Sequence, residues 1–474
     1  MADSPATDGP AKVSGRPVAV HSLIYVGGTA LQGLGVLLII PFATRILGAA
    51  EFGRVATGLV IVQMVGTIAA AGLPQVILRE HHRGPEGPRV ARALAGAMVL
   101  LALVVGLVGA LGLAVAASAG FSSLSSSIPV VVSAVSLSIV VSGQTLMRAR
   151  MQPVAFLVLA VGSTVLAQLG GLLAVRTDPT AEAYLTAYAG VIGGVALLAI
   201  LMGKPLFPTH EPTRVRQGLR LGAPLLPQAA AMLALLMGDV VLTTLLLGDA
   251  AAGTYQVSLQ LGNIAFVLST ALFNAWGPLV FSHPIERRWS FTADTGAILT
   301  AIVGAGGVGV ALLSPWLVAV MTKSDFDQVA MVHALGWLSS VGVLYMVYQG
   351  SSLAVLDAER TSRLAWTALA ALAVMVAVSL VAAPLLGIVG VAVAKVVGYA
   401  VLAAGTTWFA ARHSPLRWPV GVGVTVVLAL GLGVCAGGLL PVEGPGAWVR
   451  LGLASMVALV AAVAAPRALR SLRG

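Results

Sequence analysis

The chain has 474 residues, of which 58% are hydrophobic and only 9% are charged. Its charged residues gather in short breaks between apolar runs of about 20 residues, the length of a helix that crosses a hydrocarbon core. This excludes a soluble domain of any size. It also excludes nucleic acid as a partner despite a net charge of +10, because excess Arg marks the inner loops of membrane proteins. Backbone polar groups in lipid must be satisfied internally, so the sequence predicts an all-α polytopic bundle.

The chain begins with a polar segment, residues 1–18, that we expect to be a disordered cytoplasmic N-terminus. The sequence then predicts about 14 transmembrane helices. They lie roughly at 19–43, 56–78, 93–117, 128–147, 153–175, 184–203, 221–247, 254–280, 295–321, 328–352, 364–384, 388–410, 419–440 and 447–466.

Basic residues indicate how these helices are oriented. Most of the 27 Lys and Arg residues fall in segments that would be cytoplasmic if the N-terminus lay inside the cell. The segments on the other side hold only Arg45, Arg54, Arg176, Lys323 and Arg450. Because cytoplasmic loops carry the excess of basic residues, we expect a multi-pass protein of the cell membrane with both termini in the cytoplasm.

A weak internal repeat indicates two halves. Leu47-Gly48-Ala49-Ala50-Glu51-Phe52-Gly53 closes the first span, and Leu247-Gly248-Asp249-Ala250-Ala251-Ala252-Gly253 closes the seventh, 200 residues later. Leu, Gly, Ala and Gly recur in register, although a chain this rich in them also produces such matches by chance. Spans one and seven share an orientation, so the repeat predicts parallel halves with the substrate between them.

The predicted division has four parts after the N-terminal segment. They are an N-terminal six-helix lobe, a cytoplasmic inter-lobe linker, a C-terminal six-helix lobe, and two extra transmembrane helices with a short basic cytoplasmic tail, at 19–203, 204–220, 221–412 and 413–474.

Asp239 is an ionisable residue within the seventh span, about eight residues or roughly 12 Å below its outer end. A charge in that setting costs on the order of 3 kcal/mol, so it faces a cavity or a partner. Gln228 and Thr243 fall on the same helical face. Asp239 is therefore either a coupling site for H+ or Na+ on the cavity wall, or a structural residue bonded to a helix break or to a cation.

Lys395 lies at a similar depth in the twelfth span, about seven residues below its outer end. Three roles stay open from the sequence. Its ammonium can pair with Asp239, bind a substrate phosphate as a point charge, or snorkel toward the outer interface.

A polar stripe runs along the eighth span. Gln256, Gln260, Asn263, Thr270 and Asn274 fall within one sector of about 80° on a helix of 3.6 residues per turn. Such a stripe suits a hydrated path that offers amide and hydroxyl partners to sugars. The alternative is hydrogen bonding between packed helices.

Arginines at the membrane edges are candidate diphosphate contacts: Arg79, Arg148 and Arg220 at the inner ends, and Arg45 and Arg54 at the outer ends. The inner group can gather a diphosphate bidentately, or it only sets topology. The outer two either face an outer vestibule or pair with Glu51.

Short motifs recur in a characteristic order along nearly the whole chain. They are Arg45-Ile46-Leu47-Gly48, Glu51-Phe52-Gly53, Gly72-Leu73-Pro74 before Arg79, Gly222-Ala223-Pro224-Leu225-Leu226, Asp239, Ala252-Gly253-Thr254-Tyr255, and Pro384-Leu385-Leu386-Gly387-Ile388-Val389-Gly390-Val391-Ala392. In this order and spacing the chain resembles the polysaccharide flippases of the multidrug/oligosaccharidyl-lipid/polysaccharide exporter superfamily.

That resemblance implies two lobes around a central cavity that opens alternately to the two sides. It implies a substrate of the lipid-linked oligosaccharide class, carried on a polyprenyl diphosphate and turned from the inner to the outer leaflet for surface polysaccharide export. Glycosyltransferases and a polysaccharide polymerase are the expected partners. The drug and toxin antiporters share the scaffold, and the chain departs from them by about two extra terminal spans.

The sequence predicts a transporter rather than an enzyme, with no catalytic residue, cofactor or metal ligand. It contains no Gly-x-x-x-x-Gly-Lys-Ser/Thr motif for ATP. Two alternatives remain: a cation-coupled multidrug/toxin antiporter on the same scaffold, and a membrane polysaccharide polymerase or ligase. The latter needs a sizeable outer loop, and none is evident.

Overall fold

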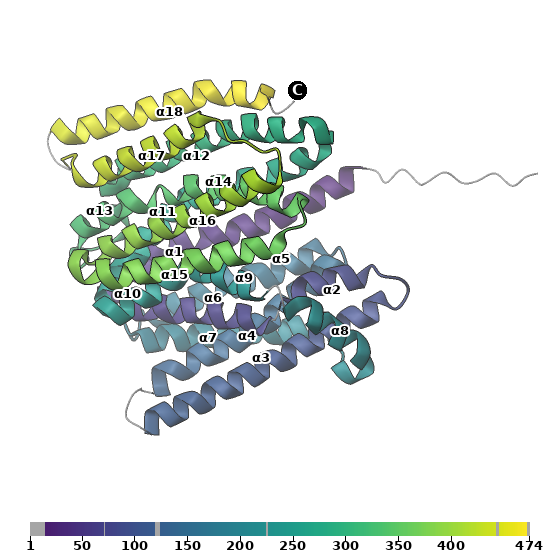
Figure 1. Ribbon diagram of the computed structural model, residues 1–474. Helices are drawn as coiled ribbons and strands as arrows, with labels where there is room; N and C mark the ends of the chain where they lie inside the picture. The colour runs from purple at the N-terminus through teal and green to yellow at the C-terminus, as the bar shows by residue number, and fades with distance from the viewer. Residues whose placement is uncertain (1–14, 71, 119–123, 224–225, 442–444, 472–474) are drawn as a thin grey trace, which may run out of the picture.

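The structure is a computed structural model that describes the backbone of residues 15–70, 72–118, 124–223, 226–441 and 445–471 (Figure 1). Every regular element in those ranges is a helix. Twelve helices in the described chain are long and apolar enough to cross a membrane. The prediction of an all-α polytopic membrane protein is therefore confirmed.

The two other predicted spans coincide with helices whose side chains are described only in part. The predicted span 19–43 is the first half of the first helix. The structure describes the side chains of this half at residue 37 and from residue 39 onward. The predicted span 447–466 falls in the last helix, whose described apolar stretch is Gly446–Leu459. The count of 14 is thus approximate.

Residues up to Gly203 form one group of helices, here called the N-terminal bundle. Its members are α1 (Gly15–Ala69), α2 (Leu73–His81), α3 (Gly87–Ser118), α4 (Leu124–Ala149), α5 (Pro153–Val161), the π-helix η1 (Gly162–Leu166), α6 (Ala167–Ala174) and α7 (Ala181–Gly203). Within it α4 packs against α3, α7 and α1.

The second group, here called the C-terminal bundle, follows the short helices η2 (Pro208–His210) and α8 (Pro212–Gly222). Its members are α9 (Leu226–Leu233), the π-helix η4 (Ala234–Gly238), α10 (Asp239–Leu247), α11 (Asp249–Ser282), α12 (Ile285–Met321), α13 (Gln328–Leu338), α14 (Val341–Asp357), α15 (Thr361–Leu386), α16 (Ile388–His413), α17 (Val420–Gly438) and α18 (Pro445–Ser471).

Three details of the predicted segmentation need correction. No outer loop separates the first two predicted spans, because α1 runs from Gly15 to Ala69 and only Gly48 (φ 72°, ψ 177°) departs from helical geometry. The second span ends at Ala69 rather than near residue 78, since Gly72 in the left-handed region starts α2. The predicted linker contains α8, which lies against α2 and α3.

The backbone supports the internal repeat. Gly248 (φ 88°, ψ 175°) breaks the chain between α10 and α11 with the same geometry that Gly48 has in α1. These angles lie in a region that favours glycine. Five residues further on, Gly53 and Gly253 bring the two helices into backbone contact, because a Cβ added to Gly53 would lie 2.8 Å from the Gly253 nitrogen.

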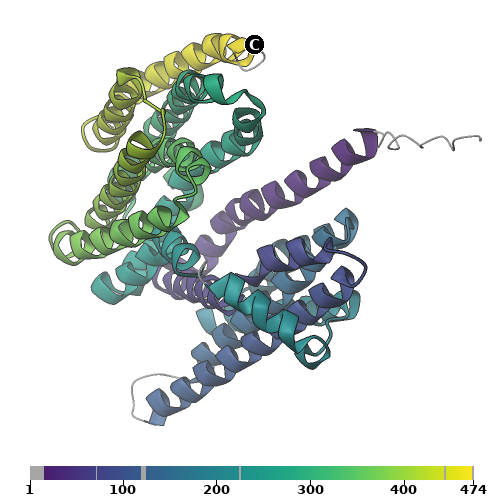
Figure 2. The ribbon, with the colours of Figure 1, turned by 45° about the vertical axis from the view of Figure 1, so that its right-hand side comes forward.

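The two bundles meet around this contact. Figure 2 shows them joined where α1 breaks and diverging toward the end from which the N-terminus extends, with the first half of α1 running between them. The last two helices, α17 and α18, pack on α12. The arrangement places α1 and α11 at the interface of the bundles.

Candidate functional site

Three amides of the predicted stripe line a pocket between the bundles. Gln256, Gln260 and Asn263 of α11 face it from one side, and Gln63 of α1 and Gln168 of α6 face it from the other. We call this the amide pocket; its volume is about 110 Å³. Oε1 of Gln256 is buried and makes no hydrogen bond within the described chain. An unpartnered acceptor of this kind is available to a ligand.

The amide pocket combines apolar walls with polar groups that carry no charge. None of the described residues that line it is Asp, Glu, Lys, Arg or His. The Tyr184 hydroxyl also lines it and donates a hydrogen bond to Oε1 of Gln168. Amides both donate and accept hydrogen bonds, which matches the hydroxyl and amide groups of sugars.

Other predicted cavity residues lie outside this pocket. Gln228 on α9 is half-buried and lies near Tyr348. Thr270 donates to the carbonyl of Phe266 in its own helix, and Asn274 is exposed. The stripe is therefore continuous in sequence, but only its N-terminal half meets the opposite bundle.

Asp239 and Lys395 form an ion pair inside the C-terminal bundle. Lys395 Nζ lies 2.8 Å from Asp239 Oδ2, and the two side chains are 1% and 0% exposed. Of the roles open to Lys395, the structure contains the pair with Asp239. The expectation that these two residues line the substrate cavity does not hold in this conformation, because packing encloses both side chains.

The local helix geometry explains the pair. The π-turn of η4, Ala234–Gly238, directly precedes Asp239 and shifts its carbonyls out of the regular hydrogen-bond ladder. The Leu236 carbonyl accepts a second hydrogen bond from Lys395 Nζ, at 2.7 Å. The Tyr255 hydroxyl donates to Asp239 Oδ2, whereas Asp239 Oδ1 is buried without a partner in the described chain.

The bundles are closed against each other at the end that the sequence predicts to lie outside, here called the outer end. Thr57 and Thr244 join their hydroxyls at 2.6 Å, and Arg54 of α1 reaches Asp249 of α11 at 2.9 Å. The Asp325 carboxylate accepts from the Ala49 nitrogen just after the break in α1. It thereby satisfies a backbone donor that the interrupted helix leaves free.

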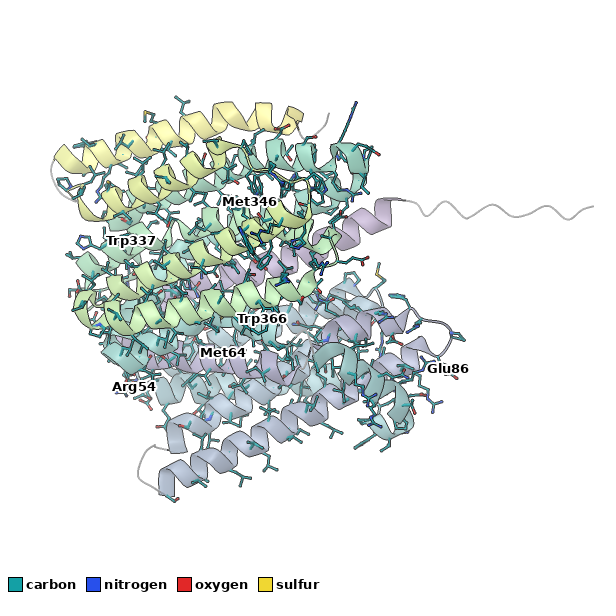
Figure 3. All side chains as sticks on the ribbon, in the orientation of Figure 1. Arg54, Met64, Glu86, Trp337, Met346 and Trp366 are labelled. Carbon is teal, nitrogen blue, oxygen red and sulfur yellow. The ribbon has the colours of Figure 1, made fainter. Side chains whose placement is uncertain are left out.

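The outer arginines are engaged in this closure. Arg54 pairs with Glu51 at 2.7 Å in addition to Asp249, so two carboxylates neutralise one guanidinium. Arg45 donates to the Val320 carbonyl across the interface at 3.1 Å. Of the alternatives for Arg54, the structure contains the pair with Glu51. Figure 3 places Arg54 at the opposite end of the molecule from Glu86, in the turn between α2 and α3.

The inner arginines of the diphosphate hypothesis lie apart from the amide pocket. Arg79 on α2, Arg148 on α4 and Arg220 on α8 are exposed. The Arg148 guanidinium lies over the Phe156 ring, 5.4 Å from its centroid. Arg150 instead donates to the last carbonyls of α7, at 3.0 and 2.6 Å.

A histidine pair lies near Arg150. His81 and His82 lie in edge-to-face contact at the end of α2, with ring centroids 5.0 Å apart. Burial, then the neighbouring charges of His82 and Arg150, lower the pKa of His81 below its ordinary value of 6.5. The neutral form of His81 is therefore favoured.

A larger cavity, of about 430 Å³, lies mainly within the N-terminal bundle between α1, α3 and α4. Its lining is apolar except near its outer end, where Arg54, Thr57, Ser127 and Asp249 contribute. In a membrane an apolar cavity suits hydrocarbon rather than sugar. It is therefore distinct in chemistry from the amide pocket.

Sequence reasoning missed Gln63, Gln168 and Tyr255. Gln63 and Gln168 are isolated amides in apolar runs of the first half of the chain. The rarity of such groups in membrane helices is the signal that identifies them. Tyr255 gave no such signal, because tyrosine is common at membrane interfaces.

The chain matches one protein family and is similar in fold to solved structures. A family model described as polysaccharide biosynthesis protein matches residues 18–283. Among solved structures, the chain is similar to the lipid II flippase MurJ in its inward closed conformation, with a TM-score of 0.66, 11% sequence identity, and coverage of 94% of this chain and 99% of that one.

The chain is also similar to an inward-facing multidrug resistance transporter of the MATE family, within the MOP superfamily. That TM-score is 0.58 at 16% identity, with 79% of this chain and 94% of the other covered. Likenesses at such identities concern the fold alone. A search of curated proteins finds no match.

Proposed function

We propose, from the premise that this chain belongs to the polysaccharide biosynthesis protein family, that it is a flippase for a lipid-linked oligosaccharide. The family model covers more than half of the 474 residues. The substrate class is a sugar on a polyprenyl diphosphate, moved from the inner to the outer leaflet by alternating access. The similar fold of a protein named as a lipid II flippase supports this proposal.

One observation carries the proposal: the amide pocket lies between the bundles, directly inside the closed outer end. Gln63 and Gln168 approach it from one bundle, and Gln256, Gln260 and Asn263 from the other. A sugar held in the amide pocket contacts both bundles. A movement that changes the distance between the bundles at either end therefore changes the side of the membrane from which the sugar can be reached. Differential binding of two states is what allows a substrate to drive such a change.

The uncharged pocket favours this function over a drug/cation antiporter. A cationic drug in the cavity is stabilised by a carboxylate that balances its charge. Asp239 is enclosed by protein and already paired with Lys395, so it offers none to the pocket. The alternative of a polymerase or ligase has no observation in its favour within the described residues.

The proposal includes a location and an organisation. The chain lies in the cell membrane with both termini in the cytoplasm, and its lobes are residues 19–203 and 221–412. Glycosyltransferases make the substrate on the inner face and a polymerase consumes it outside. Impermeant cysteine labelling of Arg412→Cys and Lys323→Cys, which lie at opposite ends of the C-terminal bundle, tests this orientation.

The function is tested by reconstitution. Purified protein in vesicles should move a fluorescent polyprenyl diphosphate oligosaccharide to the opposite leaflet, measured by its accessibility to an added lectin. Replacing Gln260 and Asn263 by Leu removes two amide partners, each worth about 0.5–1.5 kcal/mol. We expect sugar affinity to fall about five- to 150-fold.

The matched control is Gln217→Leu, the same substitution on the exposed face of α8. It should leave transport unchanged. Equal transport by the Gln260→Leu/Asn263→Leu variant and by this control would show that the sugar does not pass through the amide pocket. No movement of any lipid-linked sugar by the unmodified protein would contradict the function itself.

A further inference from the structure

The Asp239–Lys395 pair has the composition of a monovalent cation site. Lys395 Nζ lies 2.8 Å from Asp239 Oδ2 and 2.7 Å from the Leu236 carbonyl oxygen. A carboxylate and a carbonyl exposed where a membrane helix is irregular are the oxygen ligands that cations take in transporters. The ammonium nitrogen therefore occupies the point where these two oxygens would hold a free cation.

The site is closed to solvent and balanced in charge. Both side chains are at most 1% exposed. Asp239 Oδ2 accepts from Lys395 and from the Tyr255 hydroxyl, whereas Oδ1 has no partner in the described chain. The Lys395 ammonium also lies 6.0 Å from the centroid of the Tyr399 ring. A diffusible cation would have to displace the ammonium to reach the carboxylate.

We infer that Lys395 is a tethered cation, which fills a monovalent cation site in the C-terminal bundle and makes that site independent of sodium. Of the two ions expected at Asp239 from the sequence, Na+ has no position left there. Removing the lysine side chain beyond Cβ creates a site for a small ammonium ion or Na+. This goes beyond the proposed flippase function, because it holds whatever the amide pocket transports.

The experiment uses Lys395→Ala in detergent, with thermal unfolding followed by tryptophan fluorescence. The substitution removes three carbons and an ammonium, the heavy atoms of propylammonium. It leaves Asp239 buried without a cation, so the midpoint should fall by roughly 3–5 °C. Propylammonium and Na+ should each raise it again in a saturable way, as a ligand of the folded state does. Choline at equal ionic strength should not.

Two controls separate the site from general salt effects. Lys395→Ala combined with Asp239→Asn lacks the carboxylate and should respond to neither cation. Lys204→Ala removes an exposed lysine after α7 and should behave as the wild type does. The wild type itself should have one midpoint in sodium, potassium and choline chloride.

Three results would overturn the inference. One is stabilisation of the wild type by Na+ that disappears in Asp239→Asn. Another is a Lys395→Ala midpoint that no added cation changes. If Lys395→Ala unfolds on extraction, the variant is extracted in propylammonium instead. We expect folded protein under that condition, and a variant that still unfolds there would contradict the inference. None of these measurements uses a sugar substrate, so they stand apart from the test of transport.

Discussion

Replacing Gly53 by alanine should weaken the outer closure of the bundles. The added Cβ would lie 1.8 Å from the Asp249 carbonyl oxygen and 2.8 Å from the Gly253 nitrogen. Both are backbone atoms of α11, which cannot rotate away as a side chain does. The second half of α1 must therefore move relative to α11.

The size of this effect follows from the contact. Non-bonded atoms are most stable at about 3.5–4.0 Å, so the helices have to separate by roughly 2 Å at this point. Overpacking of this kind costs about 1–3 kcal/mol. Since the strain is confined to the closed outer end, the ratio of closed to open molecules should fall about five- to 150-fold.

A cysteine pair reports this ratio. The hydroxyls of Thr57 and Thr244 are 2.6 Å apart, so cysteines at the two positions come within reach of a disulfide. Cys435 is free and exposed and is replaced by Ser beforehand. The rate of cross-linking by a mild oxidant then follows the closed population, and Gly53→Ala should lower it.

The matched control is Gly194→Ala, also within a membrane helix, where an added Cβ meets nothing within 4 Å. Its cross-linking rate should equal that of the parent. Unchanged cross-linking in Gly53→Ala as well would refute the reasoning, because it would mean that the glycine contact does not hold the outer end closed.

Three further predictions concern stability. Lys395→Met leaves Asp239 unpaired and should lower the free energy of unfolding by about 3–5 kcal/mol, whereas adding Asp239→Leu should restore most of it; additive losses in denaturant titrations would contradict this. Because the pKa of His81 is lower in the folded protein, the unfolded chain binds a proton at this residue at a higher pH than the folded chain does. The contribution of His81 to the free energy of unfolding is therefore full above the ordinary pKa of 6.5 and declines as pH falls below it. His81→Asn should flatten that acid decline in a pH series of melting temperatures, and an unchanged decline would exclude His81 as its source. Arg150→Met removes two hydrogen bonds from a cation to carbonyls and should cost about 2–3 kcal/mol, with exposed Arg79→Met as the control for charge loss.

Sequence predicts the helices of this chain well because lipid imposes one rule on every span. An apolar run of about 20 residues has to be a helix, whatever its neighbours are. Glycine breaks are harder to locate. The predicted spans place a break between residues 43 and 56, but nothing within that stretch distinguishes Gly48, which interrupts α1, from Gly53, which stays helical.

Half of the amide pocket was also predictable. Gln256, Gln260 and Asn263 share a helical face, and periodicity within one helix is visible in the sequence. Which part of that face meets the other bundle depends on where the bundles diverge. Asn274, on the same face, lies beyond that point and is exposed.

The ion pair shows where the limit lies. Depth along the helices placed Asp239 and Lys395 at the same level of the membrane, which made a contact possible. Whether Lys395 turns inward depends on the rotation of α16 against α10 and on the π-turn that offers it the Leu236 carbonyl. Single-residue irregularities of that kind have no periodic signature.

The paired glycines also bear on the symmetry of the chain. Gly48 and Gly248 share a backbone geometry, and Gly53 and Gly253 meet at one contact, each with its counterpart 200 residues away. Two identical subunits that touch through one shared patch produce this reciprocity. The contact between α1 and α11 thus has the form of an isologous interface within one chain, with a pseudo-twofold axis passing through it.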